Sequence, residues 1–254
     1  MRILPWKKVK DQNWQIWQMK CYKSLIWLCV LVVLLAARPG LAQNAAHTRF
    51  DALVNEQMTE FMGRDYWQKP AILLELMDIQ PAETVADLGC GTGYFSLKLI
   101  KQVGPDGKVI ALDNDATKLN RLRLLKRYGS LEELEIVQNQ PDDLKVAASS
   151  LDKIIIFNAY HEFSDVETLL AQCRAALKPG GKVYIIDKVS DKMDNDKSSR
   201  KKLVKNHFIT RKLVEEELKA ASFGITQSMD KYTENEKAEE TRKTNWFVVV
   251  ATKE

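Results

Sequence analysis

The chain has 254 residues, of which 45% are hydrophobic and 28% are charged, a composition typical of a globular protein with a buried core. Its formal net charge is +4, but residues 1–42 alone hold seven basic groups and one acid, so residues 43–254 carry a net charge of −2. This distribution argues against a nucleic-acid partner, because the positive charge lies outside the predicted domain.

The first 42 residues predict an export signal. An apolar run at 25–37 follows two lysines and precedes Gly-Leu-Ala at 40–42, the layout of a secretory signal peptide with cleavage before Gln43. The run is shorter than the roughly 20 residues that a membrane-spanning helix needs. Translation from Met19 would give a signal of ordinary length. The alternative is an uncleaved membrane anchor, and both interpretations place the following domain outside the cytoplasm, periplasmic or secreted.

Residues 43–82 predict a helical cap that precedes the main domain, which we place at 83–254. Helical patterns at 49–62 and 72–77 flank a short segment that contains Arg64 and Trp67.

The stretch after this cap predicts a strand, a glycine-rich turn and a helix. Gly89, Gly91 and Gly93 follow a short apolar run at alternate positions, and an amphipathic pattern continues beyond them. Glycine lets the chain turn sharply and lets a ligand approach the backbone, while the helix N-terminus offers free N–H groups. This arrangement predicts a site for a nucleotide-type ligand. The spacing departs from the dinucleotide fingerprint, whose third glycine position is Tyr94 here.

Two further strands predict polar groups at the same edge of a parallel sheet. Asp113 ends the second strand, and its carboxylate can accept hydrogen bonds from both hydroxyls of a ribose. Either Asp113 or Asp115 can instead cap the helix that follows, and we assign the ribose contact to Asp113. The third strand, at 134–137, leads into a polar loop that contains Gln140.

The fourth strand is the most apolar, at 154–157, which is typical of a strand buried on both faces of a parallel sheet. Asn158, Tyr160 and His161 follow it directly and should face the reacting end of a ligand. Cys173 lies on the apolar face of the next predicted helix, 165–177, and Cys90 lies in the glycine turn, so we expect no disulfide between them.

The rest of the chain predicts one more parallel strand and a terminal hairpin. Lys-Pro-Gly-Gly ends the helix and turns the chain into a fifth strand, followed by a polar loop at 188–206. Thr210 should cap a helix that runs to about Ala221. Two strands, at about 225–232 and 245–252, end the chain.

These motifs resemble the class I S-adenosylmethionine (SAM)-dependent methyltransferases. Asp87 with the G-x-G-x-G turn resembles their motif I, Tyr-His-Glu-Phe at 160–163 resembles their fourth-strand region, and Leu-Lys-Pro-Gly-Gly at 177–181 is a companion of motif I. The resemblance extends over about 67–252. It implies an α/β fold, a Rossmann-like seven-stranded sheet with an antiparallel last strand and helices on both faces, and SAM as the cofactor.

The resemblance also implies which residues meet the cofactor. A helical segment before motif I closes over the cofactor in this family, so Arg64 and Trp67 would meet the methionine carboxylate and the sugar face; a packed N-terminal cap is the alternative. The family commonly has Gly-Asp where this chain has Asn139-Gln140, so Gln140 would have to contact the adenine. Asp142 is the second candidate for this contact, and a plain polar loop without a contact is the alternative. The predicted cofactor contacts are Arg64, Trp67, Asp87, Gly89, Gly91, Gly93, Tyr94, Asp113, Gln140, Asp142 and Asn158.

Methyl transfer mainly needs donor and acceptor held at attack distance, and a base where the acceptor carries a proton. His161 is the candidate base, since an imidazole with a pKa near 6.5 can accept a proton at neutral pH. Tyr160 and Asn158 are candidates to orient the acceptor. The alternative for His161 is a histidine that packs or bonds to Glu162 or a backbone carbonyl. The spacing of histidines and cysteines predicts no metal site.

The predicted function is transfer of a methyl group from SAM to a small-molecule or lipid-like acceptor, with membrane contact only through an uncleaved N-terminal segment. One alternative is a non-catalytic SAM- or S-adenosylhomocysteine-binding protein of the same fold, which the export signal favours because SAM is made in the cytoplasm. The other alternative is a nicotinamide-dependent reductase; the glycine spacing and the terminal hairpin argue against it.

Overall fold

The computed structural model describes residues 44–190, 199–232 and 244–254, so the predicted export signal, its cleavage site and Met19 lie outside the described residues. The same holds for 191–198 of the predicted polar loop. Of the helices that are described, none is long and apolar enough to cross a membrane. The chain divides into two compact units, Met1–Asn55 and Glu56–Glu254, and the sheet belongs entirely to the second.

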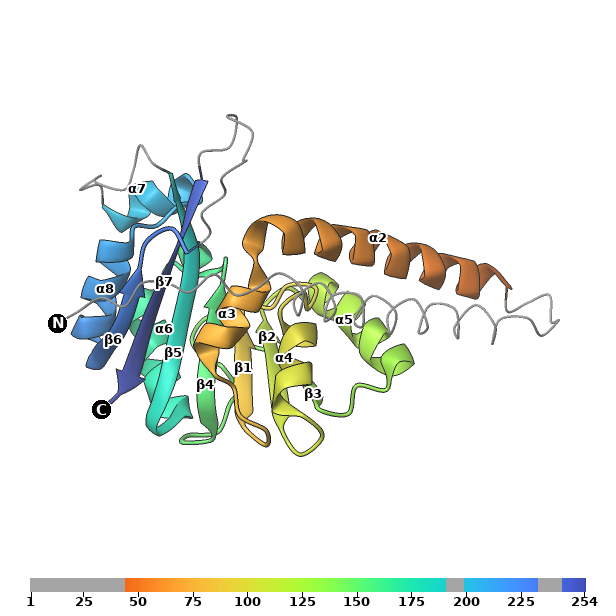
Figure 1. Ribbon diagram of the computed structural model, residues 1–254, viewed down its shortest axis with the longest axis horizontal. Helices are drawn as coiled ribbons and strands as arrows, with labels where there is room; N and C mark the ends of the chain where they lie inside the picture. Colours follow the sequence, from red (N-terminus) through yellow and green to blue (C-terminus); the bar gives the residue numbers. More distant parts are fainter. Residues whose placement is uncertain (1–43, 191–198, 233–243) are drawn as a thin grey trace, which may run out of the picture. The chain divides into compact units, whose positions relative to one another are not determined.

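Seven strands form one sheet in the order β3-β2-β1-β4-β5-β7-β6 (Figure 1). Strands β1 to β5 pair in parallel, and β7 runs antiparallel to both β5 and β6. This topology confirms the predicted Rossmann-like methyltransferase fold. The strands are β1 Thr84–Leu88, β2 Lys108–Asp113, β3 Leu134–Gln138, β4 Leu151–Phe157, β5 Leu177–Ser190, β6 Phe223–Met229 and β7 Thr244–Lys253.

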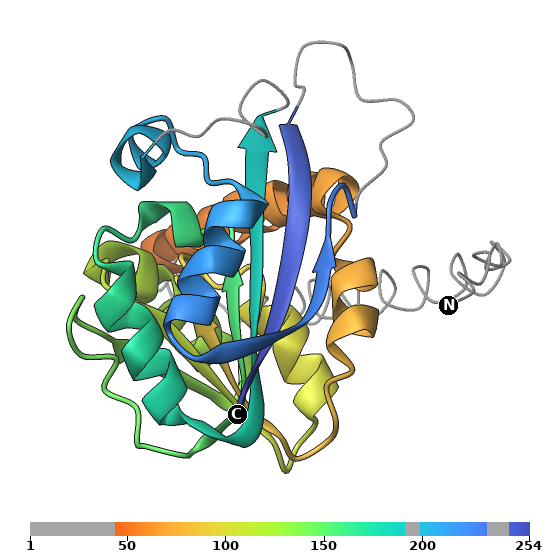
Figure 2. The ribbon, with the colours of Figure 1, turned by 90° about the vertical axis from the view of Figure 1, so that its left-hand side faces the viewer.

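Helices cover both faces of the sheet, which is why its central strands are continuous apolar runs. The buried residues of α3, α4 and α5 pack on one face, and those of α6 and α8 pack on the other. Figure 2 shows α6 and α8 on one side of the sheet with α3 and α4 on the opposite side. The helices are α2 Asn44–Gln68, α3 Pro70–Met77, α4 Ser96–Val103, α5 Ala116–Gly129, α6 Val166–Ala176, α7 Arg200–Lys205 and α8 Arg211–Ala220, with a 3-10 turn, η1, at Tyr160–Glu162.

The predicted helix caps are present, but α2 begins at Asn44 rather than near residue 49, and α7 occupies Arg200–Lys205 of the predicted polar loop. Asp115 and Thr210 cap α5 and α8 through side-chain oxygens that accept backbone N–H groups, as predicted. Helix α2 continues to Gln68 instead of ending near residue 62. It stops there because Lys69 has a left-handed φ of 46° and Pro70 begins α3, where its missing N–H costs nothing.

The two described cysteines are buried and unpaired, which confirms the expectation that they form no disulfide with each other. Cys90 packs with the core on the α4 face, and Cys173 packs with the core on the α6 face. The sheet therefore separates the two thiols.

Candidate active site

The glycine turn after β1 divides its three glycines between packing and ligand access. All three have positive φ, of 79°, 58° and 90°. A Cβ on Gly89 would lie 2.5 Å from that of Ala159, and one on Gly93 would lie 2.3 Å from Cδ1 of Leu122. A Cβ on Gly91 would meet nothing within 4 Å. Gly89 and Gly93 thus allow neighbouring elements to approach, whereas Gly91 borders open space that a ligand can occupy.

Asp113 holds this turn from the end of β2. Its Oδ2 accepts the backbone N–H of Gly91 at 2.8 Å, and its Oδ1 accepts that of Asp115 at 2.9 Å. The residue is only 7% exposed. An ionised carboxylate has about four lone-pair sites, so two backbone bonds leave acceptor capacity for the hydroxyls of a sugar. Because Asp115 caps α5, the two acids have separate tasks, as the sequence suggested.

Asp87 anchors the other end of the turn. Its carboxylate is buried and accepts the hydroxyl of Ser96, the first residue of α4, at 2.5 Å. Burial raises the pKa of Asp87 to about 6, against the opposing effects of the Ser96 hydrogen bond and the Arg64 charge. This carboxyl group therefore fixes the start of α4 against the end of β1.

Two asparagines place buried polar atoms at the ends of β3 and β4. Within the described part of the chain, Oδ1 of Asn139 and Oδ1 of Asn158 are buried and have no hydrogen-bond partner. Asn158 adopts a left-handed φ of 55°, and its backbone N–H donates to the carbonyl of Ile186 at 2.8 Å. An unpaired buried acceptor costs about 1–3 kcal/mol, so these atoms point to a bound molecule that supplies donors.

Asn139, and not the predicted Gln140, is the buried polar residue after β3. Gln140 and Asp142 are exposed, and the backbone of Gln140 forms an isolated bridge with Asp143. Asn139 is only 4% exposed and donates its backbone N–H to the carbonyl of Asp113 at 3.3 Å. Sequence reasoning missed this residue because it treated position 139 only as a departure from glycine. Its place directly after β3 was the available signal.

The C-terminal part of α2 lies against the glycine turn. Gln57 donates to the carbonyl of Thr92 at 2.7 Å, and the hydroxyl of Tyr94 donates to Asp65 at 2.7 Å. The guanidinium of Arg64 lies 3.9 Å from the centre of the Tyr94 ring. This segment packs as a cap, and the same contacts put Arg64 beside the turn where the predicted carboxylate contact would occur.

Trp67 joins a row of aromatic rings that leads toward the glycine turn. Its ring lies 5.6 Å from that of Trp246, which lies 5.8 Å from Phe157, which in turn lies 4.9 Å from Phe95. Trp67 is 38% exposed, so one end of the row reaches the surface. The predicted contact of Trp67 with a sugar stays a prediction.

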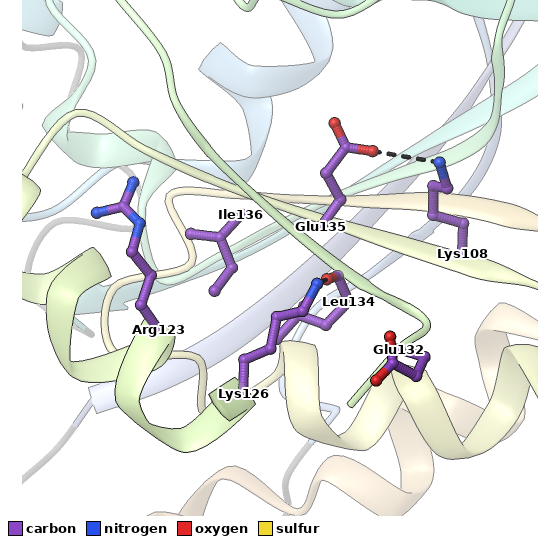
Figure 3. A pocket seen from close by; sticks show the side chains of 7 residues that line it. All are labelled: Lys108, Arg123, Lys126, Glu132, Leu134, Glu135 and Ile136. Carbon is purple, nitrogen blue, oxygen red and sulfur yellow. Dashed lines mark hydrogen bonds and ion pairs between the residues drawn. The ribbon is translucent and has the colours of Figure 1, made fainter. Parts of the chain in front are cut away.

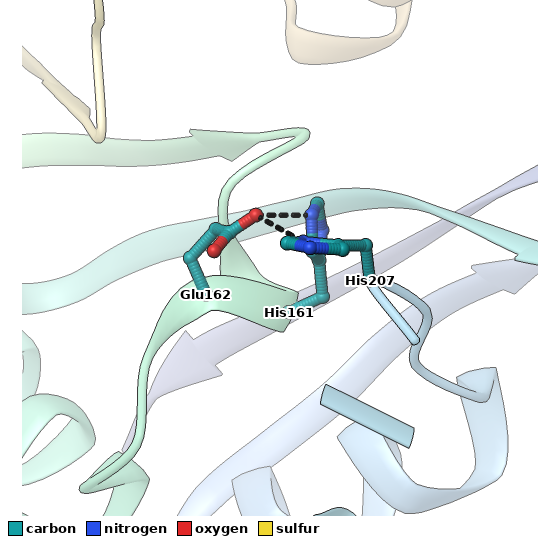
Figure 4. Close-up of side chains that lie close together, drawn as sticks. All are labelled: His161, Glu162 and His207. Carbon is teal, nitrogen blue, oxygen red and sulfur yellow. Dashed lines mark hydrogen bonds and ion pairs between the residues drawn. The ribbon is translucent and has the colours of Figure 1, made fainter. Parts of the chain in front are cut away.

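His161 forms a buried pair with Asp187 from β5. The Nδ1 atom of His161 lies 2.8 Å from Oδ1 of Asp187, and the backbone N–H of His161 donates to Oδ2 at 2.9 Å. The Nε2 atom of His161 lies 2.9 Å from Oε1 of Glu162 (Figure 4). The contact with Glu162 is the alternative that the sequence left open. Asp187 was missed, although its place at the end of an apolar strand marks the ligand-binding edge.

Tyr160 does not lie where the sequence placed it. Its ring is completely buried, and its hydroxyl donates to Glu217 of α8 at 2.8 Å. Arg200 bonds the same carboxylate and also donates to the carbonyl of Tyr160 at 3.0 Å. In a 3-10 turn, consecutive side chains point about 120° apart, so Tyr160 points into the protein while His161 faces Asp187. The predicted acceptor-orienting role of Tyr160 is therefore wrong.

Residues 79–243 match a protein-family model described as a methyltransferase domain. The chain belongs to this methyltransferase family. It is 30% identical over 155 residues to a demethylmenaquinone methyltransferase of Oceanobacillus iheyensis, a match that covers 59% of this chain and 64% of that protein. It is 31% identical over 152 residues to the ubiquinone/menaquinone biosynthesis C-methyltransferase UbiE of Blochmanniella floridana, covering 58% of each chain. The chain thus spans less than two thirds of the length of these relatives.

Solved structures agree on the fold of this chain. A SAM-dependent methyltransferase from Aquifex aeolicus superposes with a TM-score of 0.61 at 22% identity, over 74% of this chain and 92% of that one. The geranyl diphosphate C-methyltransferase of Streptomyces coelicolor, solved with S-adenosylhomocysteine, gives a TM-score of 0.57 at 10% identity, over 74% and 81% of the two chains. The predicted fold is confirmed.

SAM is the cofactor that this family assignment supports, and the residues at the carboxyl ends of the strands fit it. Gly91 leaves room for a ligand against the turn, and Asp113 keeps lone pairs for hydroxyl groups. The unpaired oxygens of Asn139 and Asn158 offer acceptors to amino or hydroxyl groups. The individual cofactor contacts stay predictions.

An open recess of about 460 Å³ lies at the opposite end of the sheet (Figure 3). Its wall includes Lys108 and Leu134, which begin β2 and β3, and Lys108 bonds Glu135 at 3.3 Å. Ligands of open α/β sheets bind at the carboxyl ends of the strands, so this recess is not the active site.

Proposed function

We propose that this methyltransferase transfers a methyl group from SAM to a small lipid-like acceptor of the quinone type. The main support for this proposal is the geometry at the carboxyl edge of the sheet. Gly91 borders open space beside Asp113 there, and Asn139 and Asn158 have buried unpaired oxygens. Two relatives are named for methylation in menaquinone biosynthesis, which supports this acceptor class.

The residues of the site have distinct roles in the proposed binding of SAM, the methyl donor. Asp113 would accept ribose hydroxyls, and Arg64, which lies beside the turn on the Tyr94 ring, would pair with the methionine carboxylate. Asn139 would accept a donor group of the base, because its oxygen is buried and unpaired. When bound, SAM supplies an activated methyl group on a sulfonium.

Aromatic and apolar side chains support an apolar acceptor. Trp67, 38% exposed and supported from behind by the buried ring of Trp246, offers a flat surface against which a planar ring can stack. Met62 and Tyr66 are 51% and 73% exposed and lie one helical turn apart on α2, so they share a face. An isoprenoid-type tail would bury such side chains and gain the free energy of removing apolar surface from water.

Binding of the donor can be tested by titration calorimetry of the full chain with SAM, comparing Gly91→Ala with Gly180→Ala. Both glycines have positive φ and open space at the Cβ position, so both substitutions strain the backbone. Only Gly91→Ala puts a methyl group into the proposed site. We expect it to weaken SAM binding at least tenfold and Gly180→Ala to leave affinity unchanged. Equal affinities of both variants would contradict the proposed site.

Turnover separates the proposed enzyme from a non-catalytic SAM-binding protein of the same fold. The full chain with SAM and a reduced demethylnaphthoquinone should release S-adenosylhomocysteine, and Asp113→Ala should abolish the release. SAM binding without turnover on any quinone-type or phenolic acceptor would favour the binding protein. We also propose export through residues 25–37, which fractionation of cells that produce the full chain would check.

A further inference from the structure

We propose that His161, Glu162 and His207 form a binding site for a divalent first-row transition-metal ion such as Zn²⁺. The three side chains come from η1 and from the segment after α7, and they converge on one point (Figure 4). Because the two histidines are separated by 45 intervening residues, the spacing rules used on the sequence did not reveal this site.

The separations of the ligand atoms suit one ion. Oε1 of Glu162 lies 2.9 Å from Nε2 of His161 and 2.9 Å from Nδ1 of His207. Two ligands of a tetrahedral zinc ion, each about 2.1 Å from the ion, lie about 3.4 Å apart, so a small outward rotation of the side chains would admit the ion. All three ligand atoms lie within 4.8 Å of one another. Glu162 and His207 are exposed, with side chains 57% and 66% accessible, so an ion can reach them and small side-chain rotations can complete the geometry.

Asp187 orients His161 as a metal ligand. Its carboxylate, completely buried in β5, lies 2.8 Å from Nδ1 of His161 and so holds the proton on that nitrogen. The lone pair of the neutral ring is then on Nε2, the atom that faces Glu162. A carboxylate behind a ligating histidine is the usual outer partner of such sites, because it fixes the tautomer and the ring orientation.

His207 is held in an uncommon backbone conformation that brings its ring to the same place. Its φ is 57°, and its N–H donates to the carbonyl of Val204 at the end of α7. Arg200 ties the start of α7 to the carbonyl of Tyr160, the first residue of η1, and to that of Phe163, which follows η1. The two segments that carry the ligands are thus joined independently of the ligands themselves.

Two imidazoles and one carboxylate suit Zn²⁺ or its transition-metal neighbours better than Mg²⁺ or Ca²⁺, which prefer oxygen ligands. Three protein ligands also leave coordination positions open to water or to a substrate oxygen.

The test is titration calorimetry of the chelator-treated full chain with Zn²⁺, repeated with Co²⁺ and read by absorption. We expect one ion per chain, and a fall in affinity of at least tenfold in Glu162→Gln and in His207→Ala. Two matched controls should keep the affinity: Glu167→Gln replaces an exposed carboxylate nearby on α6, and His47→Ala replaces the third histidine of the chain.

Absence of binding, or binding that survives both ligand substitutions, would overturn the proposed metal site. Circular dichroism of each variant would show that the fold is retained, which the exposure of Glu162 and His207 leads us to expect. SAM titrations of the same variants separate this inference from the proposed function. SAM affinity should be unchanged in both, since neither side chain belongs to the proposed donor site.

Discussion

Asp87 shows how one buried carboxyl group at the glycine turn couples the site to pH. Its pKa is raised from 3.8 to about 6 by burial, so the folded chain keeps a proton that the unfolded chain releases between these values. The stability contributed by the protonated form is complete below pH of about 4 and is lost as the pH rises through about 6. The ionised group therefore destabilises the fold at neutral pH by about 3 kcal/mol at most.

We predict that Asp87→Asn removes this pH dependence. Asparagine has nearly the same shape, its oxygen can accept the Ser96 hydroxyl, and it does not ionise. The free energy of unfolding of the variant should rise relative to wild type by about 2–3 kcal/mol between pH of about 4 and 7, measured by urea denaturation. Asp106→Asn, in an exposed turn, is the control. Parallel pH curves for wild type and Asp87→Asn would disprove the assignment.

A second prediction concerns the unpaired oxygen of Asn139. Asn139→Ala removes a buried unpaired oxygen and also one hydrogen bond, from Nδ2 to the carbonyl of Gln140 at 3.2 Å; these effects oppose each other, so the free energy of unfolding should change by less than about 1 kcal/mol. It should weaken SAM binding about five- to tenfold, the effect of one lost hydrogen bond. Asn120→Ala, on the exposed face of α5, should leave SAM affinity unchanged. Calorimetry and urea denaturation give the two values, and loss of stability without loss of affinity would refute the proposed contact.

At this scale the sequence predicted what is local and missed what is distant. The three glycines and Asp113 could be predicted because they lie at the carboxyl ends of β1 and β2, and parallel strands bring these ends to one edge of the sheet. Asp187 and His207 lie far along the chain from His161, and no periodicity reports which side chains meet across a sheet. The position of Tyr160 was predicted wrongly because the short 3-10 turn, which points the side chains of Tyr160 and His161 in different directions, has no distinct sequence pattern.

Among the elements, α2 determines how the glycine turn is covered. Tyr94 lies under this helix, with its hydroxyl on Asp65 and with Phe61 5.3 Å from its ring. Lys98 also pairs with Asp65 at 2.7 Å, so the carboxylate keeps one partner when the phenol is removed.

We therefore predict that Tyr94→Phe loosens the cap without unfolding the sheet. The loss of one hydrogen bond should cost about 1 kcal/mol. Hydrogen exchange should become faster at 59–68 of α2 and stay unchanged in β1 and β4. Tyr66→Phe, whose phenol is exposed, is the matched control and should show neither effect. Uniformly faster exchange through the whole domain would argue against a separately opening cap.

Strand positions were predicted better than the cap, for a physical reason. The strands of a parallel sheet covered on both faces are short apolar runs bounded by turns, so composition locates them. The helix from residue 44 to 68 is polar along much of its length, and only its contacts with the glycine turn and the proline at position 70 explain where it ends. The proline can be read from the sequence, whereas the contacts of α2 with the glycine turn cannot.

At the scale of the whole molecule, the sheet separates two cores that must open together. Cys90 and Cys173 report on one core each, and burial raises the pKa of both thiols, that of Cys173 to about 12. A thiol with a raised pKa that is also buried reacts only when the structure opens.

We predict that an alkylating reagent modifies Cys90 and Cys173 at the same slow rate, set by global unfolding. Mass spectrometry of peptides would read each thiol separately from the cysteines near the N-terminus. SAM should slow both reactions equally by stabilising the folded state. A much faster reaction at Cys90 would instead indicate local opening of the glycine turn, and SAM should then protect only that thiol.

Strand β7 has a consequence for how the chain is made. It is the last strand to be synthesised, yet it lies inside the sheet between β5 and β6. Until residues 244–253 emerge from the ribosome, β5 has a bare edge and β6 has no neighbour to pair with. Closure of the sheet must therefore wait for residues 244–253, because only they join β5 to β6.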